Sequence, residues 1–380
     1  MRKLAIFLPA PTPFYRALLG QLMTAFSKLG LEVQGDTTLL SEEKLLEFCQ
    51  ASKPDVLFEL NRCRWEIPSL PKSIVHISWI VDTLGRKMDQ FGGSELLYFF
   101  GYNWLLRHPH KNQSLVDWLP PGSCQHTYAF KAWHEGEISC SFVGHMPFPW
   151  NEKERHRLLT AGTDTPVRFG DLLPFYEDQL CQTHQRGFAN DDYVQVALEV
   201  LQEKFGIQQP HLDKIVYYDI GCRVIRMRNR DKLLQLALAQ NDTPVFYGTG
   251  GWGAWPQYAP FFKGPLENPA DVCRLYQNSR LALHEGVGIH FRSMDCMSSG
   301  GVLFYLASPD DDQPGGINHL FEPGVHFISV TADSFADQYR EAMNHPDQRK
   351  KIAEQAAREI RAYHTWEHRA AKIMADLNRI

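Results

Sequence analysis

Short apolar runs alternate along the sequence with stretches whose apolar residues recur at helical spacing. Residues 3–8 form the first apolar run, and residues 14–29 then carry apolar side chains at helical spacing before Gly30. Further short runs follow at residues 31–34, 55–60, 74–80 and 97–100. Runs that are apolar on both faces are typical of a parallel sheet covered by helices. The pattern therefore predicts an α/β domain in the first part of the chain.

The same alternation resumes after a turn-rich stretch at residues 118–123. The strands that it predicts are residues 138–143, 167–169, 244–247, 281–284 and 302–305. The predicted helices are residues 151–161, 174–205, 231–240, 269–277, 291–298, 333–344, 347–363 and 364–377. Since 380 residues exceed one typical α/β core, we expect two domains.

We therefore predict an α/β fold in which two Rossmann-like domains face a cleft. The expected units are residues 1–137, residues 138–362 and a closing helix at residues 363–380 that packs back on the first domain. Such an arrangement is typical of an enzyme that binds its ligand between domains.

Composition and charge exclude several classes of protein. The apolar fraction of 44% and the charged fraction of 22% are those of a folded globular chain. No apolar stretch reaches the ~18 residues of a membrane helix, and the N-terminal run is too short for a signal peptide. Eight scattered cysteines without a CxxC pair fit reduced thiols in the cytoplasm. A net charge of -5 without a basic tract argues against nucleic acid as the main partner.

Residues 248–253 satisfy the GxGxxG pattern directly after a predicted strand. A dinucleotide-binding loop of this kind requires a helix that starts on the glycines. Residues 254–262 contain Pro256 and Pro260 and do not resemble a helix start. A nicotinamide-dependent oxidoreductase is therefore the less favoured interpretation. A plain glycine turn and a loop that contacts a nucleotide sugar both remain open, and the aromatic residues at 252–262 either stack on a ligand ring or belong to the core.

Residues 284–302 predict a strand end, a glycine-bearing loop, a short helix, a glycine turn and another strand. Ligands of open α/β sheets bind at the carboxyl ends of the strands, where this loop would lie. Arg292 would begin the helix and bind a diphosphate together with the helix amides. Asp295, one turn further on, is suited to accept hydrogen bonds from a ribose diol. The alternative is that Arg292 and Asp295 merely pair with each other on a surface helix.

The order of these motifs resembles a known family. Tyr-Gly-x-Gly-Gly-Trp from Tyr247, Lys263-Gly264-Pro265, and Phe291-Arg292-x-x-Asp295 before Gly300-Gly301 are similar to the C-terminal half of the CgeB-like (spore maturation protein) glycosyltransferases, relatives of the group 1 family. Weaker landmarks extend the likeness over residues 75–370. The resemblance implies a GT-B fold and a nucleotide-diphosphate sugar as co-substrate. It also implies no cofactor and no obligatory metal, so the three aspartates at 310–312 are interpreted as a solvated turn.

The resemblance and the motif positions together assign candidate site residues. The donor-binding set is Tyr247, Gly248, Gly250, Gly251, Trp252, Lys263, Gly264, His290, Arg292, Ser293 and Asp295. The acceptor-binding set is Pro11, Phe14 and Tyr15, at the end of the first strand. Asp82 is the candidate catalytic base of an inverting reaction; its alternative role is a loop or helix-cap hydrogen bond. The acceptor would be a glycan, a protein or a small molecule, and the oligomeric state is not indicated.

One departure from the family pattern concerns two glutamates that many group 1 retaining transferases carry at this loop. The second would fall on Asp295, and the first on Val287, which has no carboxylate. Glu285 is near but out of register. The stereochemistry therefore stays open, and so does a non-catalytic nucleotide-sugar-binding protein.

Overall fold

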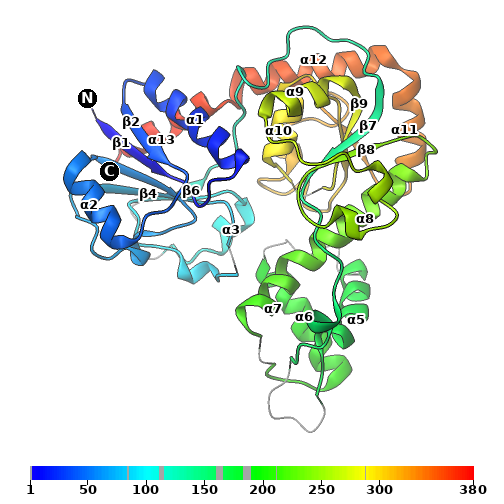
Figure 1. Ribbon diagram of the computed structural model, residues 1–380, viewed down its shortest axis with the longest axis horizontal. Coiled ribbons are helices and arrows are strands. Elements are labelled where there is room, and N and C mark those ends of the chain that lie inside the picture. Colours follow the sequence, from blue (N-terminus) through cyan, green and yellow to red (C-terminus); the bar gives the residue numbers. More distant parts are fainter. Residues whose placement is uncertain are drawn as a thin grey trace.

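The computed structural model describes residues 2–83, 85–110, 115–159, 166–182, 190–210, 212–286 and 288–380. Two parallel sheets lie beside each other, each with helices packed on its faces (Figure 1). A third, all-helical part extends away from the second sheet (Figure 1). The predicted α/β class with two Rossmann-like domains is confirmed.

The N-terminal sheet has six parallel strands in the order β2-β1-β3-β4-β5-β6. Their bounds are β1 Lys3–Phe7, β2 Glu32–Asp36, β3 Val56–Leu60, β4 Val75–Ile80, β5 Leu96–Phe99 and β6 Leu115–Trp118. The associated helices are α1 Pro13–Lys28, α2 Glu42–Ser52 and α3 Tyr102–Arg107. The order of the strands reverses between β1 and β3, which places a ligand-binding crevice of the Rossmann type at their carboxyl ends.

The C-terminal sheet has five parallel strands in the order β11-β10-β9-β7-β8. Their bounds are β7 Ile138–Val143, β8 Val245–Tyr247, β9 Ser279–His284, β10 Leu303–Leu306 and β11 Ile328–Val330. Helices α8 Val224–Leu238, α9 Pro269–Asn278, α10 Phe291–Ser298 and α11 Phe335–Asn344 connect or follow these strands. Here the strand order reverses between β7 and β9.

A helical insertion separates β7 from α8. It contains α4 Glu152–Arg155, α5 Phe169–Gln182, α6 Asn190–Phe205 and α7 Lys214–Tyr218, followed by a π-helical turn at Asp219–Arg223. Its apolar residues form a core of their own, which includes Phe169, Tyr176 and Leu201. The insertion is thus a separately packed module within the C-terminal half.

Two predictions for this insertion were wrong. Residues 167–169 are not a strand, because Phe169 begins α5 and its side chain, like those of Leu172 and Tyr176, packs at helical spacing into the insertion core. The predicted helix at 151–161 ends at Arg155, since the Leu159 amide donates to the Val167 carbonyl at 2.9 Å in an irregular pairing. Residues 160–165 and 183–189 lie outside the described residues.

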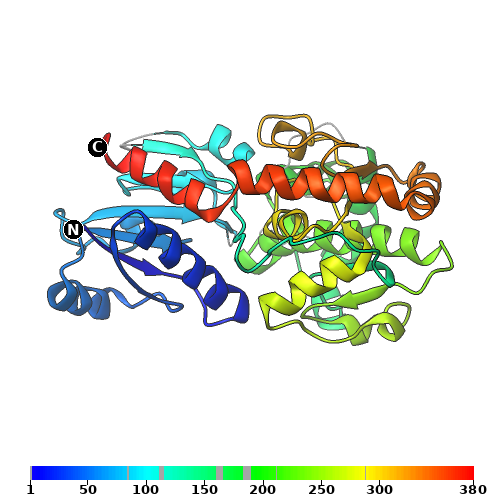
Figure 2. The same ribbon diagram turned by 90° about the horizontal axis from the view of Figure 1, so that it is seen from above.

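The chain closes by returning to the N-terminal sheet. Helices α12 Pro346–Tyr363 and α13 Trp366–Leu377 follow one another and cross from the second domain to the first (Figure 2). Helix α13 contacts α1 and contributes Trp366 and Ile373 to the N-terminal core. The Tyr98 hydroxyl donates to Asp376 at 2.8 Å. The exact domain boundary remains a prediction.

The turn at Asp310–Asp312 was predicted to be solvated. The Asp310–Asp312 turn is not fully solvated, because Asp311 is only 4% exposed and accepts from the Tyr305 hydroxyl at 2.8 Å. Burial raises the pKa of Asp311 to about 6.

None of the helices in the described ranges has the length and apolar character needed to cross a bilayer.

Candidate functional site

Arg292 joins the two strand ends at the point where the C-terminal sheet reverses its strand order. It lies in the first turn of α10 and donates through Nη1 to the Val143 carbonyl at the end of β7, at 2.8 Å. Through Nη2 it donates to Oε1 of Glu285, which directly follows β9, at 2.6 Å. Open α/β sheets bind ligands at this position.

Glu285 is the buried centre of an ion triad with two arginines. Besides Arg292, it binds Arg230 of α8, whose Nε and Nη2 donate to Oε1 at 2.9 and 2.8 Å. Burial alone would raise the pKa of Glu285, but Arg292 and Arg230 hold it well below its usual range. Burial lowers the pKa of Arg230 to about 10 despite the neighbouring Glu285. Two guanidinium groups and one carboxylate leave the triad with one net positive charge.

Several buried polar atoms around this triad have no hydrogen-bond partner within the described chain. They are Glu285 Oε2, Arg230 Nη1 and both ring nitrogens of His284. Folded proteins leave few buried polar atoms unpaired, and those that remain often mark a functional site. Burial, followed by the charge of Arg292, lowers the pKa of His284 to about 3, so this ring is neutral. The end of β9 thus carries buried polar atoms that the described residues leave unpaired, which marks it as the candidate site.

Two arginines of α8 and the arginine just before it add positive groups, although Arg223 itself pairs with Glu154 at 2.6 Å. Arg223, Arg226 and Arg230 are spaced by three and four residues, which places them on one helical face. Burial lowers the pKa of His145, the second residue after β7, to about 4, and these three arginines lower it further. The positive field at the carboxyl end of β7 suits a diphosphate.

The glycine turn after β8 lies against the end of β7. Gly248 has a φ of +138°, and a Cβ there would meet the Gly144 carbonyl oxygen at 1.9 Å. The Gly248 amide donates to the Gly264 carbonyl at 3.1 Å, and the Gly144 amide donates to the Tyr247 carbonyl at 2.9 Å. Gly250 also has positive φ, and the Gly251 amide donates to the Met146 carbonyl at 2.6 Å. A short 3-10 turn at Trp252–Ala254 follows in place of an α-helix, so the dinucleotide-binding geometry is not formed.

The aromatic run after this turn belongs to the core. Trp252 and Tyr258 are both 0% exposed. The Trp252 ring stacks on Phe262 with 5.6 Å between centroids, and its Nε1 donates to the Gly144 carbonyl at 3.1 Å. The suggestion that these rings stack on a ligand is therefore wrong for Trp252 and Tyr258. Lys263 is exposed near the same turn.

His290 and Ser293 shape the start of α10. The His290 ring accepts from the Arg292 amide at 3.2 Å, while Ser293 Oγ accepts from the His290 amide at 3.0 Å. Ser293 is fully buried. These two residues fix the helix start that presents Arg292. Val287 lies outside the described residues, so its place relative to this helix start is not described.

Asp295 faces away from Arg292. Its Oδ1 accepts from the Ser123 hydroxyl at 2.7 Å, in the segment between the two sheets. The surface pairing of Arg292 with Asp295 is therefore wrong, because Arg292 pairs with Glu285. Burial raises the pKa of Asp295 to about 7. Asp295 connects α10 to the interdomain segment.

In the N-terminal domain, Asp82 follows β4 and is an electrostatic neighbour of Arg226 in α8. The Asn61 side chain accepts from the amides of Val81 and Asp82 at 2.8 and 2.9 Å and so fixes this loop. Burial alone would lower the pKa of Arg226, but Cys222, Tyr218 and the Asp82 carboxylate raise it overall. Burial and Asp82 also raise the pKa of Tyr15. Asp82, Tyr15 and Arg226 are thus electrostatic neighbours from both halves of the molecule.

The other predicted acceptor residues lie on the rim of the same region. Pro11 and Phe14 are exposed at the end of β1. The Phe14 ring meets the edge of Phe291, the first residue of α10, with 5.0 Å between centroids. Phe291 also stacks on Phe100 of the N-terminal domain at 5.4 Å. The start of α10 is therefore packed directly against the first domain.

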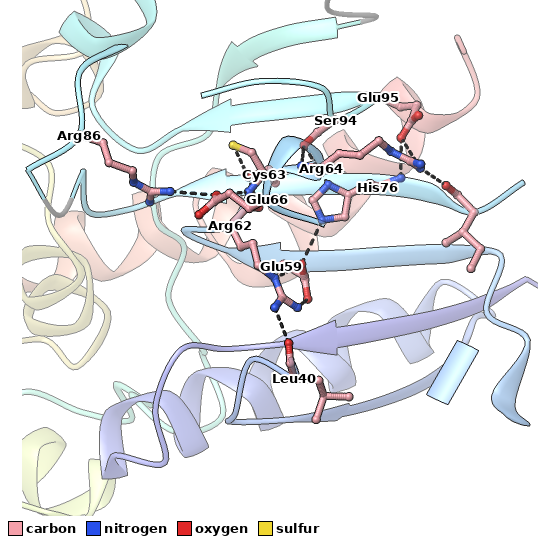
Figure 3. A network of polar contacts seen from close by, with 12 residues as sticks. Leu40, Glu59, Arg62, Cys63, Arg64, Glu66, His76, Arg86, Ser94 and Glu95 are labelled. Carbon is pink, nitrogen blue, oxygen red and sulfur yellow. Dashed lines mark hydrogen bonds and ion pairs between the residues drawn. The ribbon is translucent and has the colours of Figure 1, made fainter. Parts of the chain in front are cut away.

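A second polar cluster in the N-terminal sheet resembles a catalytic triad but is inaccessible (Figure 3). His76 lies between Ser94, with 2.8 Å from Nδ1 to Oγ, and Glu59, with 3.2 Å from Nε2 to Oε2. All three side chains are at most 1% exposed. Burial alone would raise the pKa of Glu59, but His76 and Arg62 hold it below its usual value. This cluster is structural.

Sequence analysis missed two arginines of the candidate site. Arg226 and Arg230 were overlooked because the helix was expected to begin at residue 231, whereas α8 begins at Val224. The signal was present in the run Arg223–Arg230, whose arginines recur at helical spacing. Glu285 lies outside the register of the two family glutamates, so the sequence did not assign it to the site.

Among the described residues, no group of His, Cys, Asp and Glu side chains is arranged to hold a metal ion. Metal independence remains a prediction.

Comparison with known proteins adds two findings. Residues 228–375 match a family model described as glycosyl transferase-like. This stretch contains Arg230, the glycine turn, Glu285 and Arg292. No curated protein matches the sequence.

Solved structures resemble the whole chain. They include AviGT4, a glycosyltransferase involved in avilamycin A biosynthesis (10% identity, TM-score 0.51, covering 100% of this chain and 98% of that one). Anabaena Alr3699/HepE in complex with UDP has 11% identity and a TM-score of 0.52, with 100% of both chains covered. An α-glucosyltransferase in complex with UDP and a mismatched DNA 13-mer has 9% identity and a TM-score of 0.56, with 99% of both chains covered. These likenesses show the GT-B fold.

Proposed function

We propose that the protein transfers a sugar from a nucleotide-diphosphate sugar to an acceptor. The Arg292–Glu285–Arg230 triad carries this proposal, because it places positive charge and unpaired buried polar atoms at the strand switch between β7 and β9. The same residues lie within the stretch that matches the glycosyl transferase-like family. The ordered landmarks of the CgeB-like group support membership of that group as a finer proposal.

In this proposal, each part of the site has a separate task. Arg292 and Arg226 bind the diphosphate, whose oxygens suit the forked guanidinium. The turn at Gly248–Gly251 lets the sugar approach the backbone closely. Glu285 has one oxygen without a partner among the described residues and is placed to accept from a sugar hydroxyl. Asp295 positions α10 through Ser123.

The reaction needs stabilisation of a leaving nucleoside diphosphate. The bond between the anomeric carbon and the phosphate oxygen breaks, a bond to the acceptor oxygen forms, and the diphosphate gains negative charge. Preorganised guanidinium groups stabilise this charge, and we infer that they do so without a metal. Asp82 accepts the proton of the acceptor hydroxyl, which makes the proposed reaction an inverting one.

UDP is the first nucleotide to test, because HepE and the α-glucosyltransferase were both crystallised with it. Purified protein is incubated with UDP-sugars in the absence and presence of candidate acceptors, and released UDP is measured. The proposal predicts slow release through hydrolysis without an acceptor and faster release with one. Binding without any release would favour a non-catalytic sugar-nucleotide-binding protein, and absence of binding to any nucleotide sugar would refute the proposal.

A further inference from the structure

A cavity of about 440 Å³ lies between the N-terminal domain and the helical insertion. Its lining residues are Gly85, Lys87, Asp89 and Gln90 on one side and Leu212, Lys214 and Tyr217 on the other. Its volume is within the range of small-molecule sites, and none of the residues assigned from sequence lies in it. We propose that this cavity is an acceptor subsite that selects a saccharide bearing an anionic group. The inference rests on the proposed glycosyl transfer and adds the class of acceptor.

The cavity adjoins the place where the proposed chemistry occurs. Gly85 lies shortly after Asp82 in the loop that leaves β4, and Tyr217 directly precedes Tyr218 in α7. Burial, Cys222 and the Asp82 carboxylate raise the pKa of Tyr218, so Asp82 faces this end of α7. The cavity wall and the proposed base therefore belong to the same loop after β4.

The wall from the N-terminal domain is held in place by Arg86. Its guanidinium donates to the Glu66 carboxylate at 2.9 Å (Figure 3). It also donates to the Asn61 carbonyl at 2.6 Å. It also lies 4.5 Å from the centre of the buried Phe91 ring. Met88 is buried beneath the same loop. The neighbouring side chains Lys87, Asp89 and Gln90 are exposed, and they are therefore presented from a fixed backbone.

The side of the cavity that the helical insertion contributes is also held in place by a helix cap and by core packing. Asp213 caps α7 by accepting from the Val216 amide at 2.8 Å. Val216 is buried in the core of the insertion, whereas Lys214 is exposed. A site whose walls are already ordered loses little conformational entropy when a ligand binds.

The chemistry of the lining residues suits an anionic sugar. Lys87 and Lys214 approach from opposite walls and outnumber the single carboxylate of Asp89. Lysine is a flexible point charge that binds phosphate or carboxylate. Asp89 supplies acceptors for sugar hydroxyls, and Gln90 supplies the donors of its side-chain nitrogen, because its oxygen already accepts from the Lys87 amide at 2.8 Å. The ring of Tyr217 offers an amphipathic wall for the apolar face of a sugar.

The test compares glucose 6-phosphate, glucuronate and glucose by saturation-transfer NMR with the full-length protein. The variant carries Lys87→Glu and Lys214→Glu together; the matched control is Lys204→Glu, an exposed lysine of α6. We expect at least one anionic sugar to bind more tightly than glucose. The double variant should weaken this binding by about tenfold or more, because an attractive charge contact becomes repulsive. The control should stay within about twofold of the wild type.

UDP binding by calorimetry accompanies every variant and should be unchanged in all of them. A preference for glucose 6-phosphate identifies phosphate as the recognised group, and a preference for glucuronate identifies carboxylate. Equal binding of all three sugars, no binding of any of them, or full binding by the double variant would overturn the subsite. Failure of the donor proposal appears separately, as absence of UDP binding in the wild type.

Discussion

Replacing Arg292 with alanine affects both the fold and the donor site. The substitution removes the hydrogen bonds from Arg292 to Glu285 and to the Val143 carbonyl, at 2.6 and 2.8 Å. Charge-assisted hydrogen bonds each contribute about 1.5–3 kcal/mol. Glu285 keeps Arg230 as a partner, so its charge is not fully uncompensated. We therefore expect the free energy of unfolding to fall by about 2–4 kcal/mol.

The affinity for UDP should fall by about 10- to 150-fold, which corresponds to one charge-assisted contact of about 1.5–3 kcal/mol. Urea denaturation measures the stability and titration calorimetry the affinity. Arg340→Ala serves as the control, because Arg340 is an exposed residue of α11 that pairs with Asp337. Normal UDP binding by a folded Arg292→Ala variant would refute the assignment of this arginine.

Four further substitutions test other parts of the account. Arg226→Ala should weaken UDP binding by about tenfold in calorimetry, and unchanged binding would remove it from the site. Asp82→Asn should keep UDP affinity but lower the transfer rate by about 100-fold or more in a UDP-release assay; full activity would exclude it as the base. Burial raises the pKa of Asp295 from 3.8 to about 7, so stability is lost as pH rises across that interval. Asp295→Asn should lose less stability than the wild type between about pH 4 and pH 7, and parallel melting curves would contradict this. Gly248→Ala places a Cβ 1.9 Å from the Gly144 carbonyl oxygen and should cost more than about 1 kcal/mol in urea denaturation.

Much of the fold follows from local sequence pattern. Helix α10 and strand β7 have the bounds that the apolar periodicity predicts. Helix α1 begins one residue early, at Pro13, because proline fits the first helical position and Thr12 caps the helix. The insertion was harder to predict, because Phe169 begins a helix only through packing against a core that no local pattern reveals. Strand β11 at Ile328–Val330 was not predicted from the sequence.

The candidate site was predictable only where one segment carries the whole signal. Arg292 and the glycine turn stand in local motifs, so they were found. The pairing of Glu285 with Arg230 joins residues that are distant in sequence, and no spacing rule predicts such a pair. The orientation of Asp295 depends on Ser123, a contact that exists only after the two domains pack together. The roles of Glu285, Arg230 and Asp295 therefore depend on tertiary contacts that no local sequence pattern reveals.

The central claim is that the triad around Glu285 belongs to a site for a nucleotide-diphosphate sugar. Thermal melting in the presence of UDP-, GDP-, dTDP- and CMP-sugars tests it directly, because a ligand that binds only the folded state raises the melting temperature. CMP-sugars carry a single phosphate and serve as the internal control. The account predicts that at least one diphosphate sugar raises the melting temperature of the wild type, that CMP-sugars do not, and that the rise is lost in Arg292→Ala. No rise with any diphosphate sugar, or an equal rise in the variant, would contradict it.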